Sequence, residues 1–434
     1  MALNMKNSIG IGLLGLGVVG SGVVEVLSKK KDYLQSLIGK PLSIKQVLVK
    51  DPSKDRSVKL PPDILTITYD DILNNEDVDI IIEVIGGEQP ALDFIIKAIE
   101  SGKHVVTANK EVMAKHGMVI MTAAREKGVR VLFEASVAGG TPIIGPLCRD
   151  LPANAIINIY GIINGTTNYI LTKMDRENLD LKTALTQAQS LGYAESDPSN
   201  DVKGIDAAYK LAILSTLAFG RVVKDTDVYC EGITELTSQD FVYARELGYV
   251  IKLLAIASRR EDLIQVRVHP AFVRSEEMIG KVNGVLNAIE IETDLAGKVL
   301  FIGPGAGPLP TASSIIANIL DLGISINEKG GINIPQRISN NLKISPITDL
   351  QTKYYIRLNV ADSPGVFAKV CKILGDLDIS ISSAIQKEAH QKIRGAEIVL
   401  MTHKAKEVTL RQAIAVLKEL EVVNSIGSIV RVEE

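Results

Sequence analysis

The N-terminal part of the chain is organised around SIGIGLLGLGVVG, residues 8–20. Residues 8–14 form a short apolar run, which is typical of a central strand in a parallel sheet. A GxGxxG turn follows at once, and a helix is predicted from about Ser21 to Lys31. Strand, glycine turn and helix in this order predict a Rossmann-type, doubly wound α/β domain that binds a dinucleotide.

Each glycine of this turn has its own task in that fold. Gly15 permits the tight turn, Gly17 lets the backbone approach a pyrophosphate, and Gly20 lets the helix pack on the strand. The N-terminus of the helix adds N–H groups and the positive end of its dipole. The predicted cofactor-binding residues of the turn are therefore Gly15, Leu16, Gly17, Val18, Val19 and Gly20.

The second predicted strand, residues 44–49, ends beside two residues that bear on the choice of cofactor. An acid at this tip binds the ribose 2′-hydroxyl of NAD, whereas a cation suits the 2′-phosphate of NADP. Lys50 comes first and Asp51 second, which favours NADP through Lys50 and leaves NAD open. In the alternative interpretation, Lys50 is a solvated loop charge.

Two further buried strands end in candidate site residues. The strand within residues 77–87 ends in a glycine pair that includes Gly86, and the next strand runs from His104 into Thr107-Ala-Asn-Lys110. Ligands bind beyond the carboxyl ends of such strands. Gly86 and Thr107 are therefore predicted to contact the cofactor, and Lys110 to face the nicotinamide. The alternative places Lys110 in solvent, in the first turn of a helix.

A second stretch, AQSLGYAESDPSNDVKGIDAAYK at residues 188–210, carries the predicted chemistry. An acidic loop follows Gly192, and a helix is predicted from about Val202 to Phe219. Asp206 and Lys210 are four residues apart, so they share one face of that helix. The helix is otherwise almost wholly apolar, which indicates burial, and a desolvated lysine can donate or accept a proton near neutral pH. The alternative is an ion pair on a solvated face.

The same stretch resembles the signature of homoserine dehydrogenases. The matching positions are Ala188, Gly192, Glu195, Asp197, Pro198, Asp201, Val202, Gly204, Asp206 and Lys210. The resemblance covers residues 8 to about 330. It implies reversible hydride transfer between NAD(P)H and the aldehyde of L-aspartate 4-semialdehyde, giving L-homoserine. It further implies a monofunctional enzyme of threonine, methionine and isoleucine biosynthesis, since no aspartate-kinase domain is expected before it.

On this interpretation the site residues take separate roles. Lys210 is the predicted proton donor, Asp206 orients it, and Lys110 is the second candidate. Two acids of the loop are predicted to hold the substrate ammonium, and two residues before a helix predicted at 169–174 are predicted to hold its carboxylate. The acids are Glu195 and Asp201, and the carboxylate receptor is Gly165 with Thr166.

Residues 129–140, VRVLFEASVAGG, are predicted to form another strand and a glycine-rich turn, with a helix beginning at Thr141-Pro142. From the residues alone this is only a turn. In homoserine dehydrogenases it resembles a monovalent-cation site built from backbone carbonyls and one carboxylate. The ligands that the resemblance implies are Glu134 and the carbonyls of Val137, Gly139 and Thr141. Hard oxygen ligands of this kind suit Na⁺.

The middle of the chain, residues 151–310, is predicted to form a substrate-binding and dimerisation domain. Strands are predicted at 155–163, 227–234, 263–270, 287–293 and 298–303, and a helix at 238–257. Strands grouped in this way favour an open mixed sheet that can pair across a homodimer or homotetramer. The resemblance implies that Gly307 and a helix at 311–322 lie against the cofactor. Residues 311–330 would then complete the first domain, residues 1–150.

The last part of the chain follows a polar linker, residues 331–352. The predicted element order of residues 353–434 is βαββαβ, the ferredoxin-like split motif. With Asp362-Ser-Pro-Gly365 at the first strand–helix junction, it resembles an ACT domain, a regulatory module for small metabolites. The resemblance implies an amino-acid effector, with threonine as the family-based expectation. The alternative is a dimerisation domain without effector.

The composition is that of a soluble α/β protein: 434 residues, 46% hydrophobic, net charge −3 and no tryptophan. The length exceeds what one core needs, so several domains are expected. The near-balanced charge gives no reason to expect nucleic acid or a membrane as a partner. The three scattered cysteines form neither a disulfide framework nor a metal cluster. Because no signal peptide or long apolar run is found, a cytoplasmic protein is expected.

Two rival functions stay open on the sequence. One is a dehydrogenase on the same scaffold that acts on another amino-acid aldehyde, and a panel of aldehydes with NADPH would separate it. The other is a regulator that senses a nucleotide and an amino acid, and binding without turnover would identify it.

Overall fold

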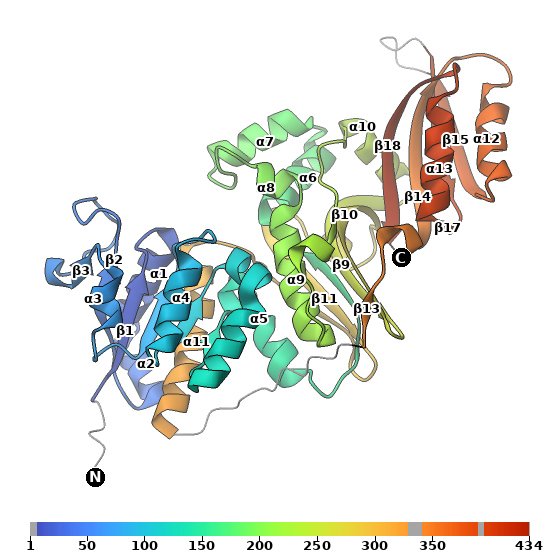
Figure 1. Ribbon diagram of the computed structural model, residues 1–434. Helices are drawn as coiled ribbons and strands as arrows, with labels where there is room; N and C mark the ends of the chain where they lie inside the picture. The colour runs from blue at the N-terminus through green and yellow to red at the C-terminus, as the bar shows by residue number, and fades with distance from the viewer. Residues whose placement is uncertain (1–6, 329–340, 389–394, 434) are drawn as a thin grey trace. The chain divides into compact units, whose positions relative to one another are not determined.

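The computed structural model describes residues 7–328, 341–388 and 395–433, which pack into two compact units (Figure 1). Unit 1 contains residues 1–157, 209–227 and 287–340, and unit 2 contains residues 158–208, 228–286 and 341–434. Each unit is built from stretches that are far apart in the sequence. The division into a nucleotide, a substrate and a regulatory domain stays a prediction.

Unit 1 holds a six-stranded parallel sheet in the order β3-β2-β1-β4-β5-β6. This is the strand order of the Rossmann fold, with the reversal beside the central strand β1. The predicted doubly wound domain is therefore confirmed. The strands are β1 (Ile9–Leu14), β2 (Leu42–Leu48), β3 (Leu65–Thr66), β4 (Ile80–Glu83), β5 (His104–Thr107) and β6 (Val131–Leu132).

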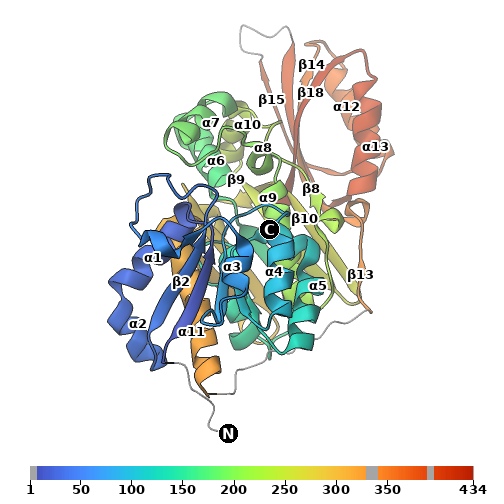
Figure 2. The same cartoon turned by 60° about the vertical axis from the view of Figure 1, so that its left-hand side comes forward.

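Helices cover both faces of this sheet (Figure 2). One face carries α1 (Val18–Lys29), α2 (Lys31–Ile38) and the late helix α11 (Pro308–Glu328). The other carries α3 (Tyr69–Leu73), α4 (Ala91–Glu100) and α5 (Lys110–Lys127). Residues 308–326 of α11 are long and apolar enough to cross a membrane by composition, but half of that window is buried. The apolar residues of α11 are explained by its place in the core against α1.

Unit 2 contains a mixed sheet that runs β7-β9-β10-β18-β14-β16-β15. Its first three strands are β7 (Ile156–Ile162), β9 (Tyr249–Arg260) and β10 (Leu263–Arg274), and its helices are α6 (Gly165–Glu177), α7 (Leu181–Ser190), α8 (Ser199–Val202) and α10 (Ser238–Glu246). Short strands β8 (Tyr229–Cys230) and β13 (Lys343–Ile344) pair with β10. Helix α9 (Ile205–Phe219) begins in unit 2 and continues into unit 1, which also holds β11 (Leu286–Thr293) and β12 (Gly297–Pro304).

Two predicted helices differ from the structure. The helix predicted at 238–257 is wrong, because α10 ends at Glu246, Gly248 follows with φ of +80°, and β9 begins at Tyr249. Most of β9 is buried on both faces, and a nearly continuous apolar run, here interrupted by Lys252, has no period that separates strand from helix. The helix predicted at 202–219 is two helices, α8 and α9, divided at Gly204, whose φ is +81°.

The C-terminal part of unit 2 has the predicted βαββαβ order. The elements are β14 (Gln351–Val360), α12 (Val366–Asp376), β15 (Ile381–Glu388), β16 (Ala396–Thr402), α13 (Glu407–Lys418) and β18 (Val423–Glu433), with the short β17 (Ala405–Lys406) before α13. The last strand also pairs in parallel with residues 271–273 of β10. The sheet of the regulatory part is therefore continuous with the sheet of the substrate part.

A buried ionic cluster lies on this C-terminal part. The Glu407 carboxylate accepts hydrogen bonds from Arg431 at 2.6 and 3.0 Å, from the Tyr354 hydroxyl at 2.9 Å and from Arg411 at 3.0 Å. Burial acts to raise the pKa of Glu407, but the hydrogen bonds and charge of Arg431, then those of Tyr354 and Arg411, outweigh it and hold that pKa below its ordinary value. The charged form of Glu407 is thus stabilised by folding.

This cluster predicts an acid-sensitive contribution to stability. Since the folded pKa of Glu407 lies below the unfolded one, its contribution is complete above the ordinary glutamate pKa of about 4.3 and is lost as the pH falls through the folded pKa. Glu407→Gln should therefore lower the urea midpoint at pH 7, and the gap to wild type should narrow below about pH 4. A gap that stays constant down to pH 3 would contradict this account.

Candidate active site

The glycine turn has the geometry that dinucleotide binding requires. Gly15 has a φ of +103°, and a Cβ added to Gly20 would lie 2.1 Å from the Gly15 carbonyl oxygen. A Cβ added to Gly17 would meet no atom within 4 Å. The first and third glycines are thus required by the protein itself, whereas the space over the second is open to a ligand.

The other residues of the turn are suited to contact a cofactor mainly through their backbone atoms. Leu16 is buried in the core, while Val18 is 69% exposed at the start of α1 and Val19 is half-buried. Gly17 is the N-cap of α1 and provides no side-chain hydrogen bond to the first turn. The N–H groups that begin α1 are therefore suited to a pyrophosphate.

The loop after β2 carries Lys54 and Arg56 in addition to the predicted Lys50. Lys50 is exposed. The Asp51 carboxylate accepts from the Ser53 backbone at 2.8 Å and from its hydroxyl at 2.6 Å, and these bonds lower its pKa. Arg56 donates to the carbonyls of Lys54 and Asp51. The contacts of Ser53 and Arg56 with Asp51 were not predicted, because they depend on how the loop folds back.

Glu83, at the end of β4, is a fully buried carboxylate that the sequence analysis missed. It accepts from the Thr107 hydroxyl at 2.6 Å and from the N–H groups of Ile85 and Gly86 at 2.9 and 3.3 Å. Burial raises its pKa. An acid at the end of the apolar run Ile80–Glu83 is the signal that could have revealed it.

The predicted cofactor residues Gly86 and Thr107 are thus joined through Glu83. The Thr107 hydroxyl also accepts from the Asn109 backbone at 3.0 Å, so its hydrogen bonds are made inside the protein. The Asn109 side chain caps α5 by accepting from Val112 and donates to the Gly87 carbonyl. This network fixes the conformation of the chain between the end of β5 and Lys110, the first residue of α5.

The two predicted lysines both belong to unit 1. Lys110 is half-buried as the first residue of α5, and Lys210 is 9% exposed on α9. Lys115 of α5 lies 5.7 Å from the ring centre of Tyr209, the neighbour of Lys210, and is bound by Glu88 and Glu111 at 2.8 and 2.7 Å. The contact places α9 beside the first half of α5. Lys210 is thus buried, as predicted, and not a charge on a solvated face.

The predicted acids meet at one side chain in unit 2. Asn164 donates through Nδ2 to Asp201 at 2.7 Å and to Asp206 at 2.8 Å. Asp206 is 4% exposed and lies one helical turn before Lys210. Asn164 was not predicted as a site residue. Its position before the predicted helix start was the available signal, since asparagine is a favoured N-cap.

The remaining predicted substrate residues lie around this cluster. Gly165 is the first residue of α6, so the prediction of a helix start at Tyr169 was four residues late. The Thr166 hydroxyl donates to the Tyr193 carbonyl at 2.6 Å, which ties α6 to the acidic loop. Glu195 is exposed on that loop. The structure therefore brings Asp201 and Asp206 together and leaves Glu195 at the surface.

Comparison with known proteins decides the family. Residues 15–134 match the family described as "Homoserine dehydrogenase, NAD binding domain", residues 142–320 match "Homoserine dehydrogenase", and residues 354–422 match "ACT domain". A homoserine dehydrogenase of Synechocystis is 43% identical over 98% of this chain and 99% of its own length. The chain belongs to the homoserine dehydrogenase family. It is an NAD(P)-dependent oxidoreductase that acts on a CH–OH group.

Further relatives agree with this assignment. The homoserine dehydrogenase of Bacillus subtilis is 39% identical over 98% of both chains. A crystal structure of a homoserine dehydrogenase from Thiobacillus denitrificans superimposes with a TM-score of 0.92 at 40% identity, covering 98% of both chains. A hyperthermophilic archaeal homoserine dehydrogenase in complex with NADPH has a TM-score of 0.62 at 27% identity, covering 76% of this chain and all of that one.

The turn for which the family resemblance predicts a cation site contains the Glu134 carboxylate and several backbone carbonyls. The Glu134 carboxylate accepts the N–H groups of residues 143, 144 and 145 at 2.6–2.9 Å, and the Gly139 carbonyl accepts from Ser314. The following helix begins at Ile144, not at Thr141. The Thr141 hydroxyl is buried with no hydrogen-bond partner among the described residues. The donor chemistry fits a hard cation, although the Glu134 oxygens already hold backbone N–H groups.

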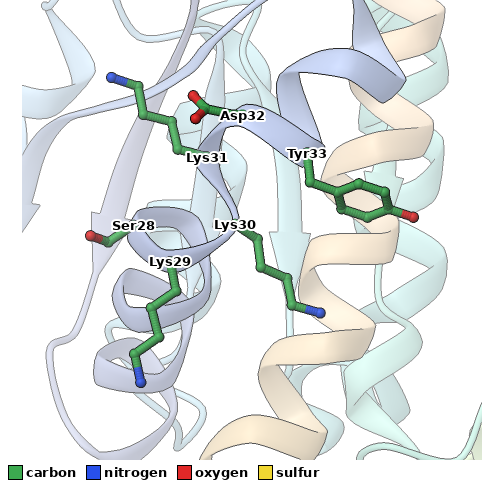
Figure 3. A pocket seen from close by; sticks show the side chains of 6 residues that line it. All are labelled: Ser28, Lys29, Lys30, Lys31, Asp32 and Tyr33. Carbon is green, nitrogen blue, oxygen red and sulfur yellow. The ribbon is translucent and has the colours of Figure 1, made fainter.

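The metal-ligating side chains and the main surface hollow of the described residues give no evidence of a further site. Within the described residues no three His, Cys, Asp or Glu side chains could share a metal ion, and the three cysteines are free. A hollow of about 400 Å³ lies at the junction of α1 and α2, lined by Ser28–Tyr33. Figure 3 shows that the side chains of Lys29, Lys30 and Lys31 diverge there, so they do not converge on an anion.

Proposed function

We propose that the protein catalyses the reversible reduction of L-aspartate 4-semialdehyde to L-homoserine with NADPH. The observation that carries the proposal is Lys210, buried on an apolar helix one turn from Asp206. The nicotinamide cofactor supplies the hydride when bound. In the reducing direction the alkoxide that forms on the substrate takes its proton from the Lys210 ammonium, with Asp206 orienting that ammonium and Lys110 as the second candidate donor.

The substrate is an amino acid, so its two charged ends need receptors. The carboxylates of Asp201 and Glu195 suit its ammonium, and the start of α6 at Gly165 and Thr166 suits its carboxylate. These contacts would fix the orientation of the bound amino acid, which is the positioning that a hydride transfer needs.

The cation-rich loop after β2 supports NADP over NAD. Lys50 and Arg56 are the cations of this loop that are proposed to bind a 2′-phosphate. The Asp51 carboxylate, which would otherwise favour a ribose hydroxyl, is bound by Ser53. Gly86 and Gly307, each with a positive φ, and the turn residues 15–20 complete the proposed cofactor contacts. Na⁺ is proposed at Glu134 and the carbonyls of residues 137, 139 and 141.

The ACT part supports a regulatory role. We propose threonine as its effector, because an enzyme early in threonine, methionine and isoleucine synthesis is a natural point of feedback, and the strand–helix junction at Gly365 is a suitable carboxylate receptor. A homodimer or homotetramer in the cytoplasm is the proposed working form.

The experiment that tests the proposal is an aldehyde-reduction assay with NADPH and NADH, with and without threonine. We expect turnover of L-aspartate 4-semialdehyde, a higher kcat/KM with NADPH, and inhibition by threonine. Binding of cofactor and threonine without turnover would overturn the proposal in favour of a regulator. A higher kcat/KM on another amino-acid aldehyde would overturn the substrate.

A further inference from the structure

The amide of Asn164 joins two acids that come from different elements. Its Nδ2 donates to Asp201 Oδ1 on α8 at 2.7 Å and to Asp206 Oδ2 on α9 at 2.8 Å. Asn164 is 6% exposed and Asp206 is 4% exposed. One amino group with two protons therefore contacts one oxygen of each carboxylate, which uses both of its donor positions.

The other end of the same amide is fixed by helix α6. Asn164 Oδ1 accepts the Thr167 N–H at 2.8 Å and the Thr167 hydroxyl at 3.0 Å, so Asn164 is the N-cap of α6. The amide is planar, and its oxygen is held by the helix. The direction of its two N–H bonds is therefore set by the cap, and the acids are placed by the start of α6.

Two carboxylates this close to one atom repel each other, and the repulsion is stronger away from water. The two N–H donors of Asn164 oppose that repulsion and hold the acids in one geometry. One oxygen of each carboxylate accepts from Asn164. The proposed reaction brings the substrate ammonium to Asp201 and the Lys210 ammonium to Asp206.

We propose that Asn164 is the positioning residue that holds Asp201, a receptor for the substrate ammonium, beside Asp206, which orients Lys210. The proposal rests on the proposed function, because it takes an amino acid as the substrate. The side-chain hydrogen bonds of Asn164 go to the two acids and to Thr167. Its effect on catalysis passes through the two acids, and through Asp206 to Lys210, one turn along α9.

The test uses two variants of the full-length protein that keep the cap. Asn164→Asp retains the cap oxygen and the size but removes both N–H donors and adds a third negative charge. Asn164→Ser also caps a helix but is too short to reach both acids. For both we expect KM for L-aspartate 4-semialdehyde to rise about tenfold or more, since hydrogen bonds to charged groups are lost. The Kd of NADPH should stay close to wild type in both variants. The thermal midpoint should stay close to wild type in Asn164→Ser, whereas Asn164→Asp should lower it, because that variant adds a charge beside two acids of a buried cluster.

The matched control is Asp180→Asn, at the N-cap of α7. Asp180 accepts the Thr183 N–H at 2.7 Å, the same cap bond without an acid pair. This variant should leave KM and kcat unchanged. A KM within about twofold of wild type for both Asn164 variants would overturn the proposal. A fall in the thermal midpoint and in the NADPH affinity of Asn164→Ser, together with its rise in KM, would also overturn the proposal, because that pattern belongs to a purely structural cap.

The equilibrium Kd of L-homoserine, measured by calorimetry in the presence of NADP⁺, tests Asn164 without turnover. We expect this Kd to rise about tenfold in both variants. Absence of wild-type turnover would overturn the proposed reaction alone. Unchanged homoserine binding in the variants would overturn the role of Asn164 alone.

Discussion

Lys210→Ala is expected to lower kcat by about 10²- to 10⁴-fold, the range for loss of a general acid. Lys210 is buried on α9, and Asp206, one turn before it, is joined to Asp201 through Asn164. Removing the ammonium leaves the alkoxide without its donor but does not touch the glycine turn. The Kd of NADPH should therefore change by less than about twofold. Steady-state kinetics and equilibrium cofactor titration measure the two quantities.

Two further variants make this expectation specific. Lys210→Arg keeps the positive charge but holds its proton too firmly to donate near neutral pH, so its kcat should also fall. Lys203→Ala removes an exposed lysine from the same stretch and should leave kcat unchanged. A kcat for Lys210→Ala within about tenfold of wild type would exclude Lys210 as the main donor and leave Lys110.

Arg357→Ala is expected to destabilise unit 2 by about 3–5 kcal/mol, the range for breaking a buried ion pair. Arg357 on β14 binds Asp240 on α10 at 2.8 Å and Glu397 on β16 at 3.0 Å. Asp240 is fully buried and also accepts from the Tyr355 and Ser428 hydroxyls. Without Arg357 its charge stays buried among neutral donors. The thermal midpoint should fall, and proteolysis should release the ACT part earlier.

The control and the rescue for this prediction are both available in the chain. Lys372→Ala removes an exposed lysine of the same part, paired with Asp376 at the surface, and should cost about 0–1 kcal/mol at most. Adding Asp240→Asn to Arg357→Ala removes the stranded charge and should restore part of the stability. Because neither residue belongs to the active site, kcat without threonine should persist. A destabilisation below about 1 kcal/mol would show that the pair does not hold the ACT part to α10.

Local patterns in the sequence were enough to predict the elements whose conformation depends only on residues within a few positions. The apolar run and glycine turn of residues 8–20 specified strand, turn and helix, because each residue there obeys a steric rule that acts within a few positions. The βαββαβ order of the C-terminal part was predicted for the same reason. The spacing of Asp206 and Lys210 placed them on one helical face, and the apolar neighbours indicated their burial.

The errors came where local pattern and tertiary packing disagree. A mostly apolar segment such as residues 249–258, which contains Lys252 and ends at Ser258, is compatible with strand or helix, and pairing with β10 selected the strand. The break at Gly204 was missed although a glycine that follows a helix with positive φ is a common stop signal; a Cβ there would lie 3.1 Å from Cys230 Sγ, a residue distant in the sequence. Glu83 and Asn164 were missed because their importance lies in partners that are 24 to 42 positions away.

The sequence by itself determined the Rossmann architecture and the ACT-like tail, and it indicated the candidate reactive groups, since glycine conformation, apolar periodicity and side-chain chemistry are properties of short segments. Only the tertiary structure decided how those groups are arranged. It joined Asp201 and Asp206 through the Asn164 amide, bound Thr107 to the buried Glu83, and paired β18 with β10 into one sheet. The physical reason is that hydrogen bonds and burial act over a few ångströms of space, and only the folded chain brings distant residues within that range.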